Sequence, residues 1–113
     1  MYGDDMLEID MDSKYGILFV RLFGELTKKT RKKLNNEVWN LLVNVGIKNV
    51  VFNLENLNKL DESGFKTLVK CYDVCNHNDG NTMICLSKNK FNYDLNSFNV
   101  VPDELSAVNL INV

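Results

Sequence analysis

Histidine and cysteine are scarce in this chain, which has a single histidine, His77, and three cysteines, Cys71, Cys75 and Cys85. A serine hydrolase needs a histidine base beside its nucleophile. The serine that could serve as a nucleophile, Ser63, lies at the start of a predicted helix, and His77 lies at the opposite end of that helix. The cysteines are odd in number and lack Cys-x-x-Cys spacing, so neither a disulfide framework nor a redox motif is expected. Reduced thiols in a cytoplasm fit this pattern best.

A zinc site built from the cysteines and the histidine is not expected either. On a helical wheel, Cys75 joins the buried stripe of its helix, Cys71 flanks that stripe, and His77 points to the polar side. Metal ligands must converge on one point, and these three side chains do not. We therefore predict thiols in the core and a histidine at the surface, with no metal and no cofactor.

Long apolar runs and a large charge imbalance are also absent. No run approaches the length of a membrane span, and the first residues, Met1 to Asp5, are acidic rather than signal-like. The net charge of −2 gives no reason to expect nucleic acid or an anionic membrane as a partner. The basic residues between Lys28 and Lys33 lack interleaved aromatics and are interpreted as a solvated helix face.

What is present is the composition of one globular domain. The 113 residues are 45% hydrophobic and 25% charged, and they contain no linker, internal repeat or low-complexity segment. Residues 6–11 alternate weakly and predict an edge strand. Three further runs, nearly continuous in apolar residues, predict strands covered on both faces: Gly16–Phe23, Asn49–Leu54 and Thr82–Leu86.

Helical stripes separate these strands. The first stripe predicts a helix from Lys29 to about Val45, with Leu34, Val38, Leu41, Leu42 and Val45 on its apolar face. Gly46 is expected to end this helix, and Thr27 and Thr30 are the alternative caps at its start. After a loop over residues 55–62, a second stripe consists of Phe65, Leu68, Val69, Tyr72 and Cys75 and stops at Asp79-Gly80.

Strand, helix, strand, helix, strand at this spacing predicts two right-handed βαβ crossovers onto one mixed, mostly parallel sheet of the α/β class. The C-terminal part is less regular. Residues 91–98 are predicted to form a short helix. A last helix is expected to start at Pro102-Asp103-Glu104, with Leu105, Val108 and Leu110 packing back on the domain.

Functional loops of open α/β sheets lie at the carboxyl ends of the strands. Here these are Gly24–Thr27 and Asn56–Ser63, which share one rim if their strands are neighbours. Ser63 would then face Thr27, with Asn53 below the serine. Ser63 is interpreted either as an ordinary helix cap, a role also open to Asp61, or as an attachment point for phosphate.

Ser63 and Lys66 also match the Ser-x-x-Lys nucleophile motif of penicillin-recognising enzymes. The companion motifs of those enzymes are absent and the chain is far too short, so this interpretation is set aside.

Taken together, these motifs resemble the STAS domain family, whose best-known members are anti-sigma factor antagonists. The resemblance is carried by Gly24-Glu25-Leu26, by Val50–Leu54, by Asp61-Glu62-Ser63-Gly64 and by Gly80, and it covers roughly residues 6–110. The late segment Asp103–Ala107 resembles the terminal segment of sporulation-type members. The resemblance implies a single STAS-like domain over residues 1–113.

The resemblance also implies a function, that of a regulatory protein-binding module without enzyme activity. Such antagonists bind an anti-sigma factor that is also a serine kinase, the kinase phosphorylates the serine before glycine, and a phosphatase restores the complex. By position, Ser63 is the phosphoacceptor. The residues expected to contact the partner of this otherwise monomeric protein are Glu25, Thr27, Asn53, Asp61, Glu62, Ser63, Gly64 and Lys66.

Two departures from the family pattern leave alternatives open. Glu62 stands where Ser or Thr is more usual, and Thr27 stands where many antagonists carry Asp. A STAS scaffold that binds a signalling partner constitutively therefore remains an alternative. A small enzyme or ligand carrier using Thr27 and Ser63 is a third, against which stand the missing base–nucleophile pair, Gly-rich phosphate loop and ligand cluster.

Overall fold

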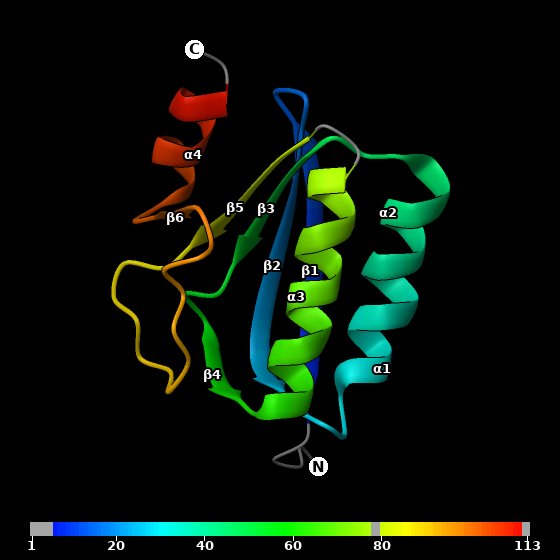
Figure 1. Cartoon of the computed structure of the whole chain (residues 1–113), viewed down its shortest axis with the longest axis vertical. Helices are drawn as coiled ribbons and strands as arrows, with labels where there is room; N and C mark the ends of the chain where they lie inside the picture. The colour runs from blue at the N-terminus through cyan, green and yellow to red at the C-terminus, as the bar shows by residue number, and fades with distance from the viewer. Residues whose placement is uncertain (1–5, 78–79, 112–113) are drawn as a thin grey trace.

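A mixed β-sheet with helices on both faces makes up the computed structural model, which describes residues 6–77 and 80–111 (Figure 1). The strands are β1 (Leu7–Lys14), β2 (Ile17–Leu26), β3 (Asn49–Asn53), β4 (Leu57–Leu60), β5 (Asn81–Cys85) and β6 (Val100–Val101). The helical segments are α1 (Arg31–Leu34), the π-helical turn η1 (Asn35–Trp39), α2 (Asn40–Val45), α3 (Glu62–His77) and α4 (Glu104–Ile111).

The strand order in the sheet is β1-β2-β3-β5-β6. Every pairing is parallel except that of β1 with β2, which is antiparallel. The β1–β2 connection is a two-residue turn in which Tyr15 and Gly16 both have positive φ, as a type I′ hairpin requires. The predicted α/β class and the mostly parallel sheet are confirmed. The predicted edge strand is also confirmed, and it extends to Lys14.

Alternate residues of β2 belong to two separate hydrophobic clusters, one on each face of the sheet. Leu18, Val20 and Leu22 pack beneath α1, α2 and α3, whereas Ile17 and Phe19 belong to the smaller cluster beneath α4. All five are buried, which confirms that this apolar run is covered on both faces. Figure 1 shows α1 and α2 end to end in one column beside α3, with α4 standing apart near β5 and β6.

The segment predicted as a loop over residues 55–62 contains the strand β4. β4 runs parallel to the last residues of β2, past a register shift between Gly24 and Glu25, so β2 continues beyond the predicted end at Phe23. Gly24 has φ +97°, and a Cβ there would lie 2.3 Å from the Met6 carbonyl oxygen. The loop prediction was wrong because a four-residue strand leaves little periodicity to detect.

The first predicted helix is present but is not one regular helix. Its middle is η1, in which the Asn40 N–H donates to the Asn35 carbonyl, and this wider turn shifts the following residues around the helix axis. Val45, predicted on the buried stripe, is consequently 64% exposed, and Leu41 is only half-buried. Gly46 ends α2 with φ 71°, as predicted.

The second predicted helix, α3, buries Leu68, Tyr72 and Cys75 as expected. It is described as far as His77, and Asp79 of the predicted stop lies outside the described residues. Cys71 is buried as well, and burial raises the pKa of its thiol to about 12. Cys85 lies in the cluster on the other face of the sheet, apart from Cys71 and Cys75, which share the larger cluster.

Residues 91–98, predicted as a short helix, form irregular turns instead. The segment is held by aromatic contacts with α3: the Tyr93 ring stacks on Phe65 at 4.6 Å, and the Phe98 ring meets Tyr72 edge-on at 4.7 Å. Burial of its aromatic side chains against α3 therefore fixes this segment without a helical backbone pattern.

The last helix starts where predicted, because the Asp103 carboxylate accepts a hydrogen bond from the Ser106 N–H at 2.8 Å. The predicted packing face was wrong in part. Leu105 and Leu110 are 69% and 58% exposed, and the helix instead packs through Ala107 with Val108 and Ile111. Within the described parts of the chain, no helix is both long enough and apolar enough to cross a membrane.

Candidate functional site

The two predicted loops do lie on one rim of the sheet. Leu26 at the end of β2 is paired with Leu60 at the end of β4, so Thr27 and Asp61 leave the sheet side by side. The Asp61 N–H also donates to the Leu26 carbonyl at 3.3 Å. The short strand β4, rather than β3, thus brings the start of α3 to the end of β2.

Asp61 is the cap of α3. One of its carboxylate oxygens accepts the Gly64 N–H at 2.8 Å, and the other accepts the Lys28 N–H at 2.9 Å. Burial opposes ionisation of this carboxylate. The N–H groups of Gly64 and Lys28, the charge of Lys59 and the Ser63 N–H together outweigh burial and hold the pKa of Asp61 below its ordinary value. Of the two caps that the sequence left open, the structure selects Asp61.

Ser63 is therefore not needed as a cap. It is the second residue of α3 and is half-buried, and its hydroxyl makes no hydrogen bond within the described residues. Its carbonyl accepts the Thr67 hydroxyl at 3.0 Å. The start of α3 is therefore held by Asp61, and the Ser63 hydroxyl takes no part in holding it.

Gly64 is required by close packing. A Cβ at this position would lie 2.1 Å from the Leu26 carbonyl oxygen, so the first turn of α3 contacts the end of β2 directly. The serine–glycine pair thus combines a free hydroxyl with a residue that cannot carry a side chain.

A shallow depression of about 220 Å³ opens beside the serine. We call it the Ser63 depression, and its lining residues are Arg31, Ser63, Lys66, Thr67 and Lys70. The α3 members recur at helical spacing and share one face, while Arg31 comes from the first turn of α1. The sequence interpretation missed Arg31 and Lys70 as neighbours of the serine, although the spacing of 63, 66, 67 and 70 was a usable signal.

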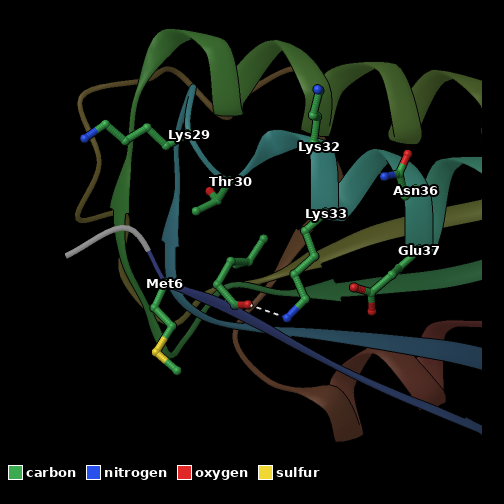
Figure 2. A pocket seen from close by; sticks show the side chains of 8 residues that line it. Met6, Lys29, Thr30, Lys32, Lys33, Asn36 and Glu37 are labelled. Carbon is green, nitrogen blue, oxygen red and sulfur yellow. Dashed lines mark hydrogen bonds between the residues drawn. The ribbon is translucent and has the colours of Figure 1, made fainter. Parts of the chain in front are cut away.

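A second, larger depression of about 540 Å³ lies on the other side of α1, against the start of β1 (Figure 2). Lys32 and Lys33 line it, together with Glu37 of η1. The Lys33 ammonium donates to the Leu7 carbonyl at 2.8 Å, which ties α1 to the edge strand. The basic residues predicted as a solvated face are exposed. Lys29, Lys32 and Lys33 line the larger depression, whereas Arg31 borders Ser63.

Thr27 lies on the rim but is buried. Its hydroxyl accepts the Lys29 N–H at 3.3 Å, and its own N–H donates to the Thr30 hydroxyl at 2.9 Å. The Thr30 hydroxyl donates in turn to the Glu25 carbonyl at 2.8 Å. Thr30 occupies the position before α1 without bonding to its N–H groups, so both threonine hydroxyls are used within the turn.

The predicted place of Asn53 below Ser63 was wrong. Strand residues alternate between the two faces of a sheet, and Asn53 points to the face that α4 covers, like Val51. Its amide donates to the Glu104 carboxylate of α4 at 2.7 Å and accepts the Glu55 N–H at 2.9 Å. α3 and Ser63 lie over the opposite face.

Glu62 and Lys66 are both exposed and form an ion pair at 3.1 Å along α3. Together with Ser63 they make up the solvent-facing part of the rim, while Asp61 and Gly64 support it from beneath. The described residues contain no group of three or more metal-ligating side chains, and Asp61 has no histidine beside it. The rim thus presents the Glu62–Lys66 ion pair beside one hydroxyl that makes no hydrogen bond within the described residues.

The fold is that of a known domain family. The STAS domain family model matches residues 8–100, so the chain belongs to the STAS domain family. An anti-sigma F factor antagonist of Paenibacillus polymyxa is 29% identical over 79 residues, which cover 70% of this chain and 68% of that protein.

Solved structures are similar over nearly the whole chain. An anti-sigma factor antagonist from Mycobacterium paratuberculosis matches with a TM-score of 0.82 at 16% identity, covering 100% of both chains. The Bacillus cell fate determinant SpoIIAA in its phosphorylated form matches with a TM-score of 0.68 at 15% identity, covering 91% of this chain and 99% of that one. At these identities the likeness establishes the fold.

Proposed function

We propose that this STAS domain is a cytoplasmic regulatory module that binds an anti-sigma factor with serine kinase activity and is controlled by phosphorylation of Ser63. The observation that carries the proposal is the division of roles between Asp61 and Ser63. Because the Asp61 carboxylate caps α3, the Ser63 hydroxyl is not needed to hold the helix start and lies unbonded at the rim.

Known relatives support the proposal. The Paenibacillus polymyxa relative is named an anti-sigma F factor antagonist, and one solved protein of this fold is a phosphorylated form. In the transfer, the Ser63 Oγ forms a bond to the γ-phosphorus of kinase-bound ATP. The bond from that phosphorus to the bridging oxygen of ADP breaks, and the hydroxyl proton passes to a base of the kinase. A serine phosphatase would reverse the modification.

The proposed contact surface is the exposed part of the rim. Glu62, Ser63 and Lys66 would touch the partner, with Glu25 at the edge and Asp61 and Gly64 beneath them. A phosphate carries about −1.5 to −2 charges and would alter a surface fitted to a neutral hydroxyl. Asn53 and the buried Thr27 are not part of this surface, since one lies over the opposite face and the other is engaged in its own turn.

The constitutive scaffold remains the second candidate because of Glu62. Its side chain is 76% exposed directly beside Ser63, so the unmodified rim already carries one negative charge. The ion pair with Lys66 offsets part of that charge.

The test is the affinity of the monomeric domain for the serine kinase anti-sigma factor of the same genome, measured by calorimetry. Ser63→Ala is expected to bind like the unmodified protein, and Ser63→Asp at least about tenfold more weakly, a difference of about 1.4 kcal/mol. Ser13→Asp is the matched control, because Ser13 is exposed near the β1–β2 turn, at the other end of β2. Mass spectrometry after incubation with kinase and ATP should place phosphate on Ser63. Equal affinities of all variants would reject the switch in favour of the constitutive scaffold.

A further inference from the structure

The Ser63 depression gathers positive charge around a neutral hydroxyl. Arg31 reaches it from α1, and Lys66 and Lys70 reach it from α3, within a hollow of about 220 Å³. Two helices that are far apart in the sequence thus bring cations to the depression that Ser63 lines. Among the described residues, the acidic side chains at the start of α3 are Glu62 in its first turn and the cap Asp61, whose carboxylate is bonded to backbone N–H groups.

The three cations differ in how far they are already compensated. Lys66 pairs with Glu62 at 3.1 Å, and the Lys70 ammonium lies 4.2 Å from the centre of the Trp39 ring. Arg31 is exposed, and its guanidinium forms no ion pair with any residue that the structure describes. An aromatic ring carries no net charge, so Arg31 and Lys70 both leave uncompensated positive charge in the depression.

We infer that the Ser63 depression is an intramolecular phosphate-binding site, in which Arg31, Lys66 and Lys70 hold the phosphate of phosphorylated Ser63. The inference rests on the proposed phosphorylation of Ser63, and it identifies the side chains that neutralise the charge of the phosphate. A phosphate monoester offers three acceptor oxygens, and a guanidinium binds two of them in a bidentate manner.

The helix N-terminus alone does not supply this site. The Gly64 N–H of the first turn is already bonded to the Asp61 carboxylate, as is the Lys28 N–H of the neighbouring turn. The backbone donors that usually bind an anion at a helix start are thus partly used, and side-chain cations must neutralise the phosphate.

This geometry changes what phosphorylation does to the rim. The phosphate converts a basic depression into a neutral one and joins α1 to α3 through Arg31. A partner that places an acidic side chain over Arg31 and Lys70 would lose its counter-charge at the same time as it meets the bulk of the phosphate. A carboxylate at position 63 is shorter and singly charged, so it fills the depression less completely.

The test uses full-length protein with phosphoserine incorporated at position 63 during translation, followed by phosphorus NMR across pH 4 to 8. A cation beside the phosphate favours the dianion and lowers the second phosphate pKa from its ordinary value of about 6. In the wild-type background we expect a lowered pKa. Arg31→Gln and Lys70→Gln should each raise it again, Arg31→Gln by about 0.5 unit or more, a threefold change in proton affinity.

Lys32→Gln is the matched control, because Lys32 has the same charge on the same helix but lines the other depression (Figure 2). It should leave the phosphate pKa close to the wild-type value. Equal pKa values in the wild type and Arg31→Gln would overturn the inference, and so would equal upward shifts in Arg31→Gln and Lys32→Gln, which would indicate general charge rather than a site.

Thermal unfolding tests whether Arg31 stabilises the protein only when Ser63 is phosphorylated, as a phosphate-binding site requires, or also without phosphate. Without phosphate, Arg31→Gln should melt like the wild type, because Arg31 has no partner to lose among the described residues. With phosphoserine, the wild type should melt at a higher temperature than Arg31→Gln, and no difference would count against the site. Since the phosphoserine is installed without a kinase, these results do not depend on the calorimetric test of the partner.

Discussion

Asp61 joins the two loops of the rim through the backbone of Lys28. Its carboxylate accepts the Lys28 N–H from the turn after β2 and the Gly64 N–H from the first turn of α3, at 2.9 and 2.8 Å. One side chain thereby fixes where α3 begins and how the turn before α1 lies beside it. The rim that carries Ser63 keeps its shape because of this acid, and Ser63 itself contributes little to it.

Replacing Asp61 and Ser63 by alanine, one at a time, should show that Asp61 and not Ser63 stabilises the rim. Asp61→Ala removes the cap and leaves the Lys28 N–H without its acceptor, so we expect a loss of about 1–2 kcal/mol in the free energy of unfolding. Ser63→Ala should change it by less than about 0.5 kcal/mol. Urea unfolding followed by circular dichroism measures both. A larger loss for Ser63→Ala than for Asp61→Ala would show that the serine is the cap.

Most of the fold was predictable because its strands are strongly apolar. Runs such as Asn49–Leu54 are covered on both faces, and that burial requires continuous apolar sequence. Gly46 marked a helix end for an equally local reason, its positive φ. The strand β4 and the turn η1 were not predicted, because both depend on tertiary packing. β4 forms only where it meets the end of β2, and η1 inserts a wide turn into a helical stripe that looks regular in the sequence.

The site was predictable as a rim but not as a set of contacts. The sequence placed Thr27 and Ser63 at strand ends, and the structure confirms the shared rim. It could not say which face of the sheet Asn53 points to, because that depends on strand register. Nor could it join Arg31 to Ser63, since helix α1 packs against α3 only in the folded domain.

Gly64→Ala should destabilise the domain although alanine is the better helix former. Alanine is favoured in a helix by about 1 kcal/mol, but its Cβ would lie 2.1 Å from the Leu26 carbonyl oxygen. The first turn of α3 must then move away from β2, at a net cost of about 1–3 kcal/mol. Asn76→Ala, at an exposed position of the same helix, is the control and should be neutral or slightly stabilising. Equal stability of the two variants would mean that the contact relaxes without cost.

Truncations along the first helical stretch should follow the observed burial rather than the regular stripe. Leu42→Ala removes a fully buried side chain and should cost about 2–5 kcal/mol, and Leu68→Ala in α3 should cost a similar amount. Leu41→Ala should cost less because Leu41 is half-buried. Val45→Ala, 64% exposed after the π-helical turn, should change stability by less than about 0.5 kcal/mol. A large loss of stability in Val45→Ala would mean that Val45 is buried, as the regular helical stripe predicts.

The attachment of α4 should depend on pH through Glu104. Both carboxylate oxygens of Glu104 accept hydrogen bonds from the Arg21 guanidinium at 2.8 Å, and one also accepts the Asn53 amide at 2.7 Å. The bonds from Arg21 are the main cause that lowers the pKa of Glu104, burial opposes them, and Asn53 adds to them. A carboxylate with a lowered folded-state pKa stabilises the fold above its unfolded pKa, about 4.3, and this contribution is lost as the pH falls through the folded-state value.

Glu104→Gln should therefore be less stable than the wild type at pH 7, by about 1–3 kcal/mol, because the neutral amide binds Arg21 more weakly and one of its two groups cannot accept. As the pH falls from 5 to 3 the wild type should lose stability faster than the variant, so the two unfolding free energies should converge. Urea unfolding at each pH measures this gap. Glu37→Gln, at an exposed position of η1, controls for the loss of one charge and should show no such convergence. A gap between wild type and Glu104→Gln that stays constant down to pH 3 would mean that the Arg21–Glu104 pair holds α4 by packing rather than by charge.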